Sequence, residues 1–176
     1  MRAITGKYKG RHFEVPRNFK ARPTTDFAKE NLFNVLKAYL DFEDCHALDL
    51  FSGTGNISLE LLSRGCPRVV AVEKDFLHYK FIYEVMKSLK EERISVLKAD
   101  VLKFIPKATE QFNFIFADPP YKLQELANIP EMIFNSNLLA DDALFVLEHG
   151  KDYDFSSNPH FVEHREYGSV NFSFFK

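Results

Sequence analysis

The sequence contains no tryptophan and only two cysteines, Cys45 and Cys66, which form no CxxC spacing and no Cys/His cluster. Isolated cysteines are typical of small buried residues and argue against a disulfide framework or a zinc site. We therefore expect a reducing, cytoplasmic environment. No apolar run approaches the roughly 20 residues that span a membrane. The N-terminal stretch MRAITGKYKGR also lacks the apolar segment of a signal peptide.

Internal repeats and low-complexity segments are absent as well. A chain of 176 residues with 45% hydrophobic content is long enough to bury one ample core. The sequence predicts one globular domain, residues 23–176, preceded by a basic extension, residues 1–22.

Positive charge is concentrated in that extension, although the formal net charge of the chain is only −2. Residues 1–22 carry seven basic side chains against one acid, Glu14, whereas the remainder carries 16 basic and 24 acidic side chains. A basic edge on an acidic body is typical of proteins that contact polyanions. The candidate nucleic-acid contacts are Arg2, Lys7, Lys9 and Arg11. The alternative is a solvated surface with a chance excess of positive charge.

The extension is predicted to fold as a β-hairpin. Residues 2–5 and 11–15 resemble two short strands on either side of the glycine-flanked tip Gly6-Lys7-Tyr8-Lys9-Gly10. Tyr8 and His12 offer flat side chains that can stack on bases or pack beneath the hairpin, and the sequence leaves both options open.

From residue 46 onward, short apolar strands alternate with amphipathic helices, which predicts an α/β fold with a mostly parallel sheet. The expected strands are 46–51, 69–73, 94–98, 112–117 and 143–148. The expected helices are about 27–39, 56–64, 75–90, 101–106 and 123–135. Two alternating runs around Gly168, within residues 161–175, predict an antiparallel hairpin that completes a seven-stranded sheet.

The stretch LDLFSGTGNISLE, residues 48–60, indicates a strand, a small-residue loop and the start of a helix. Gly53 and Gly55 allow positive φ and the close approach of a ligand to the backbone. A dinucleotide fingerprint requires a third glycine where Ser58 stands. Asp49, just before the loop, would repel a pyrophosphate but suits the ammonium group of S-adenosylmethionine. The loop therefore favours a cationic adenosyl ligand.

Acidic residues stand at the ends of four successive predicted strands: Asp49, Glu73, Asp100 and Asp118. Ligands of doubly wound sheets bind beyond the carboxyl ends of the strands. There Glu73 suits two ribose hydroxyls, and Asp100 suits an adenine amino group. Each acid alone is equally consistent with a cap on the following helix.

The tetrad Asp118-Pro119-Pro120-Tyr121 follows the fourth predicted strand. The prolines remove two N–H donors, which leaves carbonyl acceptors beside the Asp118 carboxylate. Accepting both hydrogens of an exocyclic amino group favours a pyramidal nitrogen whose lone pair can attack a methyl group, while Tyr121 stacks on the base. No metal and no covalent enzyme intermediate is required. The alternative is a Pro-Pro turn that ends a strand.

These motifs together resemble the RsmD-type small-subunit (16S) ribosomal RNA guanine-N2-methyltransferases, which use S-adenosylmethionine. The resemblance covers nearly the whole chain, through MRAITGKYKGRHF, RPTTDFAKENLFNVL, LDLFSGTGNISLELLSRG, VEKD and FADPPY. It implies a Rossmann-like class I methyltransferase domain and a target-base site at Asp118, Pro119, Pro120 and Tyr121. The implied cofactor site comprises Asp49, Phe51, Ser52, Gly53, Gly55, Asn56, Glu73, Asp100 and Val101, with Arg22 and Thr24 nearby.

The resemblance also implies the partner: small-subunit ribosomal RNA or a partly assembled subunit, bound through Arg2, Lys7, Lys9 and Arg11. No membrane and no obligate protein partner is implied, so we expect a monomer. Thr24, Thr25 or Asp26 can cap the helix that follows, or Arg22 and the threonines can face the ligand loop.

Two other functions remain open from the sequence. The same tetrad serves DNA adenine-N6 methyltransferases, although the short loops here leave no room for the target-recognition insertion those enzymes usually carry. A non-catalytic RNA-binding or ribosome-assembly factor on a methyltransferase scaffold is the other, and the intact strand-end acids argue against it.

Overall fold

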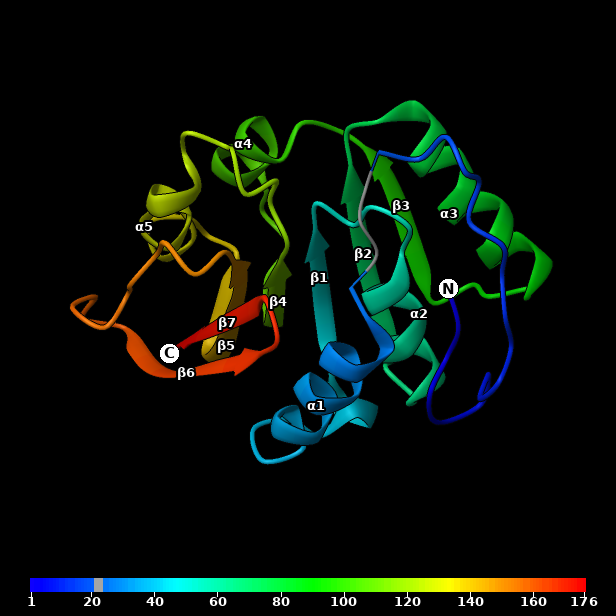
Figure 1. The fold of residues 1–176 in the computed structure, drawn as a ribbon, viewed down its shortest axis with the longest axis horizontal. Helices are drawn as coiled ribbons and strands as arrows, with labels where there is room; N and C mark the ends of the chain where they lie inside the picture. Colours follow the sequence, from blue (N-terminus) through cyan, green and yellow to red (C-terminus); the bar gives the residue numbers. More distant parts are fainter. Residues whose placement is uncertain (21–23) are drawn as a thin grey trace.

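The computed structural model describes residues 1–20 and 24–176 and contains one seven-stranded sheet of order β3-β2-β1-β4-β5-β7-β6 (Figure 1). The first five strands in this order run parallel, β7 runs antiparallel to β5, and β6 antiparallel to β7. The strands are β1 (His46–Leu50), β2 (Arg68–Glu73), β3 (Ile94–Lys98), β4 (Phe112–Ala117), β5 (Leu139–His149), β6 (Phe161–Tyr167) and β7 (Val170–Phe175). The predicted sheet, including its C-terminal hairpin, is confirmed.

Helices cover both faces of the sheet (Figure 1). They are α1 (Asp26–Leu36), α2 (Asn56–Ser63), α3 (Phe76–Ser88), α4 (Val101–Phe104) and α5 (Ile129–Phe134), with short 3₁₀ turns at Phe42–Asp44, Ile105–Lys107 and Leu126–Asn128. Alternate residues of each strand serve opposite faces: Ala47 packs with α1, α2 and α3, whereas Leu48 packs with α4 and α5. This alternation in buried strands creates two apolar layers from one sheet.

Several predicted boundaries differ from the structure. The first helix ends at Leu36 rather than residue 39, and β1 ends at Leu50 because Phe51 has a left-handed φ of 58°. The helix predicted over 123–135 begins only at Ile129, where Pro130 occupies its first turn, and a 3₁₀ turn precedes it. β5 is longer than predicted and reaches His149.

The N-terminal segment turns back on itself as predicted, but the two predicted strands, 2–5 and 11–15, are wrong. Only isolated bridges form, Arg2 with His12 and Ala3 with Lys9. Backbone hydrogen bonds such as Phe13 N–H to the Met1 carbonyl join the two arms, but the next donors along the chain are used by α2 and the ladder does not continue. The Glu60 carboxylate accepts the N–H groups of Ile4 at 2.8 Å and Thr5 at 3.1 Å.

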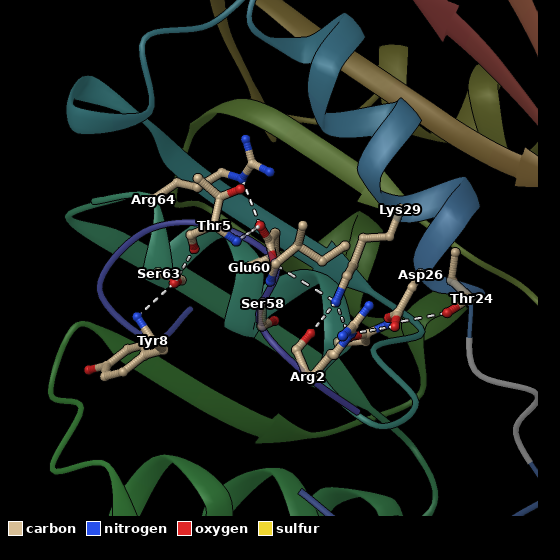
Figure 2. Close-up of polar contacts among 12 residues, drawn as sticks. Arg2, Thr5, Tyr8, Thr24, Asp26, Lys29, Ser58, Glu60, Ser63 and Arg64 are labelled. Carbon is tan, nitrogen blue, oxygen red and sulfur yellow. Dashed lines mark hydrogen bonds and ion pairs between the residues drawn. The ribbon is translucent and has the colours of Figure 1, made fainter. Parts of the chain in front are cut away.

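The turn of this segment presses directly on α2. The Lys7 N–H donates to the Ser63 carbonyl at 2.7 Å, and a Cβ on Gly6 would lie 1.8 Å from that carbonyl oxygen. Figure 2 shows the polar contacts that join the segment to α1 and α2. Tyr8 is buried, and its hydroxyl donates to Glu91 at 2.6 Å, so Tyr8 packs beneath the segment rather than presenting a stacking surface.

Candidate active site

A cleft of about 1170 Å³ lies beyond the carboxyl ends of the parallel strands. Residues at or just beyond the carboxyl ends of β1, β2, β3, β4 and β5 contribute to its lining. Ligands of doubly wound sheets bind at this edge, where the strand order reverses on either side of the first strand. The predicted residues that line the cleft are Thr24, Asp49, Phe51, Ser52, Gly53, Asn56, Glu73, Asp100, Val101, Asp118, Pro119, Pro120 and Tyr121.

The loop between β1 and α2 is built on left-handed backbone. Phe51, Gly53 and Gly55 have φ values of 58°, 54° and 77°. A non-glycine residue in this region stores strain, and such strain clusters at ligand sites. Gly55 does not line the cleft, because it faces α3, where an added Cβ would lie 3.0 Å from the Ile82 side chain. Gly55 is therefore needed for its φ and for packing, whereas Gly53 forms part of the cleft wall.

The Asp49 carboxylate contacts the first turn of α2, which follows this loop. Its buried Oδ2 accepts the backbone N–H of Ser58 at 3.2 Å and the Ser58 hydroxyl at 2.5 Å. Burial raises the pKa of Asp49 to about 7, against these two hydrogen bonds, which favour the carboxylate, and with a smaller contribution from Glu73. Ser58 stands where a dinucleotide fingerprint has glycine. It donates hydrogen bonds to Asp49, the acid that would repel a pyrophosphate.

Glu73 joins the loop to the start of α3. Its two carboxylate oxygens accept the N–H groups of Gly53 and Asp75, each at 2.8 Å. A carboxylate oxygen can accept two hydrogen bonds, so each oxygen can still accept a hydroxyl from a ligand in the cleft.

Asp100 combines the two roles that the sequence left as alternatives. It caps α4 by accepting the Leu102 N–H at 3.0 Å, and it lines the cleft together with Val101. Lys74 Nζ lies 2.9 Å from its carboxylate, and this hydrogen bond holds the pKa of Asp100 below its usual value.

The Asp-Pro-Pro-Tyr tetrad leaves β4 at the centre of the sheet. The Asp118 N–H donates to the Leu50 carbonyl at 3.2 Å, which fixes the turn against β1. Pro119 is buried, whereas Tyr121 is 42% exposed. The Tyr121 ring packs against Gly150, where an added Cβ would lie 3.3 Å from the ring. Burial raises the pKa of Asp118 well above its usual value, and the nearby carboxylates of Glu148 and Asp49 raise it further.

Glu148 is a site residue that the sequence reasoning missed. Glu148 lies near the end of β5. Ala117 of β4 pairs with Leu147 of β5, and Asp118 and Glu148 are the residues that follow this pair in the chain. Glu148 accepts the Tyr121 hydroxyl at 3.1 Å and the Thr24 hydroxyl at 3.4 Å. Burial raises its pKa to about 7. The signal was present in the sequence, because Glu148 is the last residue of the predicted strand 143–148 and a fifth acid in the strand-end series.

The segment before α1 resolves another open alternative. Thr25 is the N-cap, since its hydroxyl accepts the Ala28 N–H at 3.2 Å. Thr24 faces the cleft, and its carbonyl accepts the Asn56 side-chain amide at 3.3 Å. The prediction for Arg22 falls outside the described residues.

The predicted RNA contacts lie away from the cleft floor. Lys7, Lys9 and Arg11 are exposed, and none of them forms an ion pair within residues 1–20 and 24–176. Arg2 is exposed too, but its Nε lies 2.6 Å from Asp26 at the start of α1.

The described part of the chain contains no helix long and apolar enough to cross a membrane. It also contains no group of three or more His, Cys, Asp or Glu residues arranged to hold a metal ion.

The sheet order, the cleft at its carboxyl edge and the strand-end acids define the Rossmann-like class I methyltransferase fold. An Escherichia coli structure described as "Putative methyltransferase yhhF" superposes with a TM-score of 0.87, at 28% identity, over 99% of this chain and 96% of the other.

The chain belongs to the family described as "Conserved hypothetical protein 95", whose model matches residues 1–176. The "Putative rRNA methyltransferase YlbH" of Bacillus subtilis is 34% identical over 158 residues, covering 88% of this chain and 85% of its own. The "Ribosomal RNA small subunit methyltransferase D" of Escherichia coli K12 is 31% identical over 148 residues, covering 84% and 74%. The RsmD-type resemblance is thereby confirmed.

Proposed function

We propose that this protein transfers a methyl group from S-adenosylmethionine to the exocyclic N2 amino group of a guanine in small-subunit ribosomal RNA. The observation that carries the proposal is the meeting of two sets of residues in one cleft. The Asp118-Pro119-Pro120-Tyr121 turn forms one part of its wall, and the strand-end acids Glu73 and Asp100 form another. The RNA class is taken from relatives named as ribosomal RNA methyltransferases.

The residues of the cleft suit S-adenosylmethionine. Glu73 keeps lone pairs for two ribose hydroxyls, and Asp100 lies at the next strand end along, where an adenine amino group can donate to it. Burial raises the pKa of Asp49, Asp118 and Glu148, so a cationic ligand would relieve the cost of their negative charge. When bound, this cofactor supplies a sulfonium methyl group whose transfer leaves a neutral thioether and releases one proton from the accepting amine.

Asp118 and the carbonyl of Pro119 would then accept the two hydrogens of the target amino group. Proline has no N–H, so this turn presents acceptors without a competing backbone donor at either Pro119 or Pro120. Tyr121, on the exposed side of the same turn, offers a ring on which an extruded base can stack. The protein's contribution is chiefly positioning of the nucleophilic nitrogen.

The exposed Lys7, Lys9 and Arg11 provide an RNA-facing surface beyond the cleft. Exposed basic side chains bind phosphates without reading sequence, so these residues would set affinity and register rather than base choice.

The test uses radiolabelled S-adenosylmethionine with three acceptors: naked small-subunit RNA, small subunits that lack this methylation, and a DNA duplex. Nucleosides of the labelled product are then identified. N2-methylguanosine from RNA or subunits is the expected result. N6-methyladenine in the DNA would indicate the alternative DNA activity, and cofactor binding without label in any acceptor would indicate a non-catalytic factor.

A further inference from the structure

The base specificity of this site depends on a residue outside the Asp-Pro-Pro-Tyr tetrad. That tetrad holds an amino group, and both adenine and guanine carry one. The two bases differ at the ring nitrogen beside it: guanine N1 carries a hydrogen and donates, whereas adenine N1 is an acceptor. A group that faces this nitrogen therefore decides between the bases.

Glu148 occupies a suitable place for this task. Ala117 and Leu147 are paired neighbours in adjacent parallel strands, and Asp118 and Glu148 are the next residue of each. Paired positions point to the same side of a sheet, and adjacent strands lie about 4.8 Å apart. Both side chains line the cleft, and their carboxylates are close enough to raise the pKa of Asp118.

The orientation of Glu148 is fixed from both sides. Its Oε1 accepts the Tyr121 hydroxyl at 3.1 Å, and its Oε2 accepts the Thr24 hydroxyl at 3.4 Å. Thr24 is in turn held by the side chain of Asn56 at 3.3 Å. Glu148 is only 4% exposed, so its remaining acceptor capacity is directed into the cleft rather than to bulk water.

We infer that Glu148 is a specificity-determining residue whose carboxylate accepts the N1–H of guanine while Asp118 and Pro119 accept the N2 hydrogens. This inference rests on the proposed function. Two acceptors on neighbouring strand ends match the two adjacent donors on the guanine edge. The same carboxylate would face the N1 lone pair of adenine, which leaves a buried charge unpaired and rejects that base.

Glu148→Gln is the decisive variant, because it keeps the size of the side chain but adds an N–H donor. The substrates are small subunits reconstituted with RNA that carries guanine or 2-aminopurine at the mapped target position. 2-Aminopurine keeps the 2-amino group but has an acceptor at N1. Assays at pH 8 keep the carboxylate as the main form, because burial raises the pKa of Glu148 to about 7.

The wild-type enzyme should prefer guanine by at least about 100-fold in kcat/KM, since sites built for a substrate N–H reject analogues that lack it strongly. Glu148→Gln should lose activity on guanine and gain on 2-aminopurine, so that the preference falls to within about tenfold. The loss of guanine O6 in the analogue affects both enzymes alike and cancels in this comparison.

Two further variants keep the test decisive. Glu148→Asp retains a carboxylate, so it should slow methylation yet still prefer guanine. Glu131→Gln makes the same change at an exposed residue of α5 that does not line the cleft, and it should alter neither rate nor preference. If Glu148→Gln slows both substrates equally, or if the wild type does not discriminate, the inference is wrong. If the wild type methylates neither base, the proposed function itself fails.

Discussion

The five strand-end carboxylates around the cleft differ in what already contacts them. Glu73 and Asp49 accept backbone N–H groups, Asp100 contacts a lysine, and Asp118 lies beside the carboxylate of Glu148. Replacing a carboxylate that accepts backbone N–H groups should change ligand binding and loop structure together. Replacing one that faces the cleft beside another acid should change the rate of the reaction. Substitutions should therefore separate these roles.

Asp118→Ala should lower kcat by at least about 100-fold, the scale found when one preorganised hydrogen-bonding group is removed from an active site. The dissociation constant of S-adenosylmethionine, measured by calorimetry, should stay within about twofold, because the proposed function places Asp118 against the target amine rather than the cofactor. Asp118→Asn keeps one oxygen acceptor and should give an intermediate rate. Loss of cofactor binding along with activity would make Asp118 a structural residue.

Glu73→Ala should weaken cofactor binding by roughly 10- to 100-fold, as expected for lost hydrogen bonds to a charged group. Because Glu73 also holds the N–H groups of Gly53 and Asp75, a second ligand separates the two effects. An S-adenosylhomocysteine analogue without ribose hydroxyls should show a much smaller difference between wild type and variant. An unchanged dissociation constant for the natural cofactor would exclude the ribose contact.

At the scale of secondary-structure elements, a buried ionic cluster joins α1, α2 and the N-terminal segment (Figure 2). Lys29 of α1 and Glu60 of α2 are fully buried, with Nζ and Oε2 3.8 Å apart. Lys29 also donates to the Arg2 carbonyl at 2.5 Å and to Asn56 at 2.6 Å. Burial lowers the pKa of Lys29, which is the cost of placing this charge inside. The cluster links the N-terminal segment to Asn56, the first residue of α2, which lines the cleft.

Glu60→Ala should destabilise the protein by about 3–5 kcal/mol, the usual cost of leaving one member of a buried ion pair without its partner. That corresponds to a fall in Tm of roughly 10 °C for a domain of this size. Scanning calorimetry measures the shift, and trypsin cleavage at Lys7, Lys9 or Arg11 should become faster because the anchor of Ile4 and Thr5 is gone. The control is Glu131→Ala at an exposed position, which should change neither the Tm nor the cleavage rate. A Tm of Glu60→Ala equal to that of the wild type would contradict the role of the cluster.

At the scale of the whole molecule, the buried acids should make the stability of the ligand-free protein depend on pH. Asp49 and Glu148 both have a pKa raised to about 7, against unfolded values near 4. The folded state thus binds more protons than the unfolded state between about pH 4 and 7. Their contribution to stability is present at low pH and is lost as the pH rises through 7.

The Tm of the ligand-free wild type should therefore fall by several degrees between pH 5.5 and pH 8 relative to Glu148→Gln, whose side chain does not titrate. Taking the difference between the two proteins cancels histidine titrations common to both, including that of His149, whose pKa is lowered by burial. Thermal unfolding at four or five pH values is sufficient. Parallel curves would show that Glu148 does not titrate in this range.

The uneven charge of the whole chain leads to a second prediction at this scale. Replacing Lys7, Lys9 and Arg11 by glutamate should weaken RNA binding and reduce the slope of log affinity against log salt by roughly 2, as expected for about three lost phosphate contacts. Filter binding over a range of salt measures both. The same reversal at the exposed Lys87, Lys90 and Lys107 controls for net charge. Equal effects of the two triple variants would exclude a specific role for the N-terminal surface.

Patterns local in sequence determined the sheet, the order of its elements and most of the cleft residues of this protein. Period-2 and period-3.6 apolar spacing depends only on neighbours along the chain, and strand ends in a parallel sheet meet at one edge whatever the details of packing. That is why Glu73, Asp100 and Asp118 can be assigned to a common cleft from their positions in the sequence alone.

Contacts between distant segments were decided only by the tertiary structure. Glu60 accepts the backbone N–H groups of Ile4 and Thr5, which therefore cannot take part in a strand ladder. These residues lie 56 and 55 positions before Glu60 in the chain, so no local pattern predicts the contact. Gly55 is constrained by Ile82 on another helix, and the Glu148 carboxylate is held in place by Tyr121 and Thr24. The residue types were readable from the sequence, but their partners were set by the packing of elements far apart in the chain.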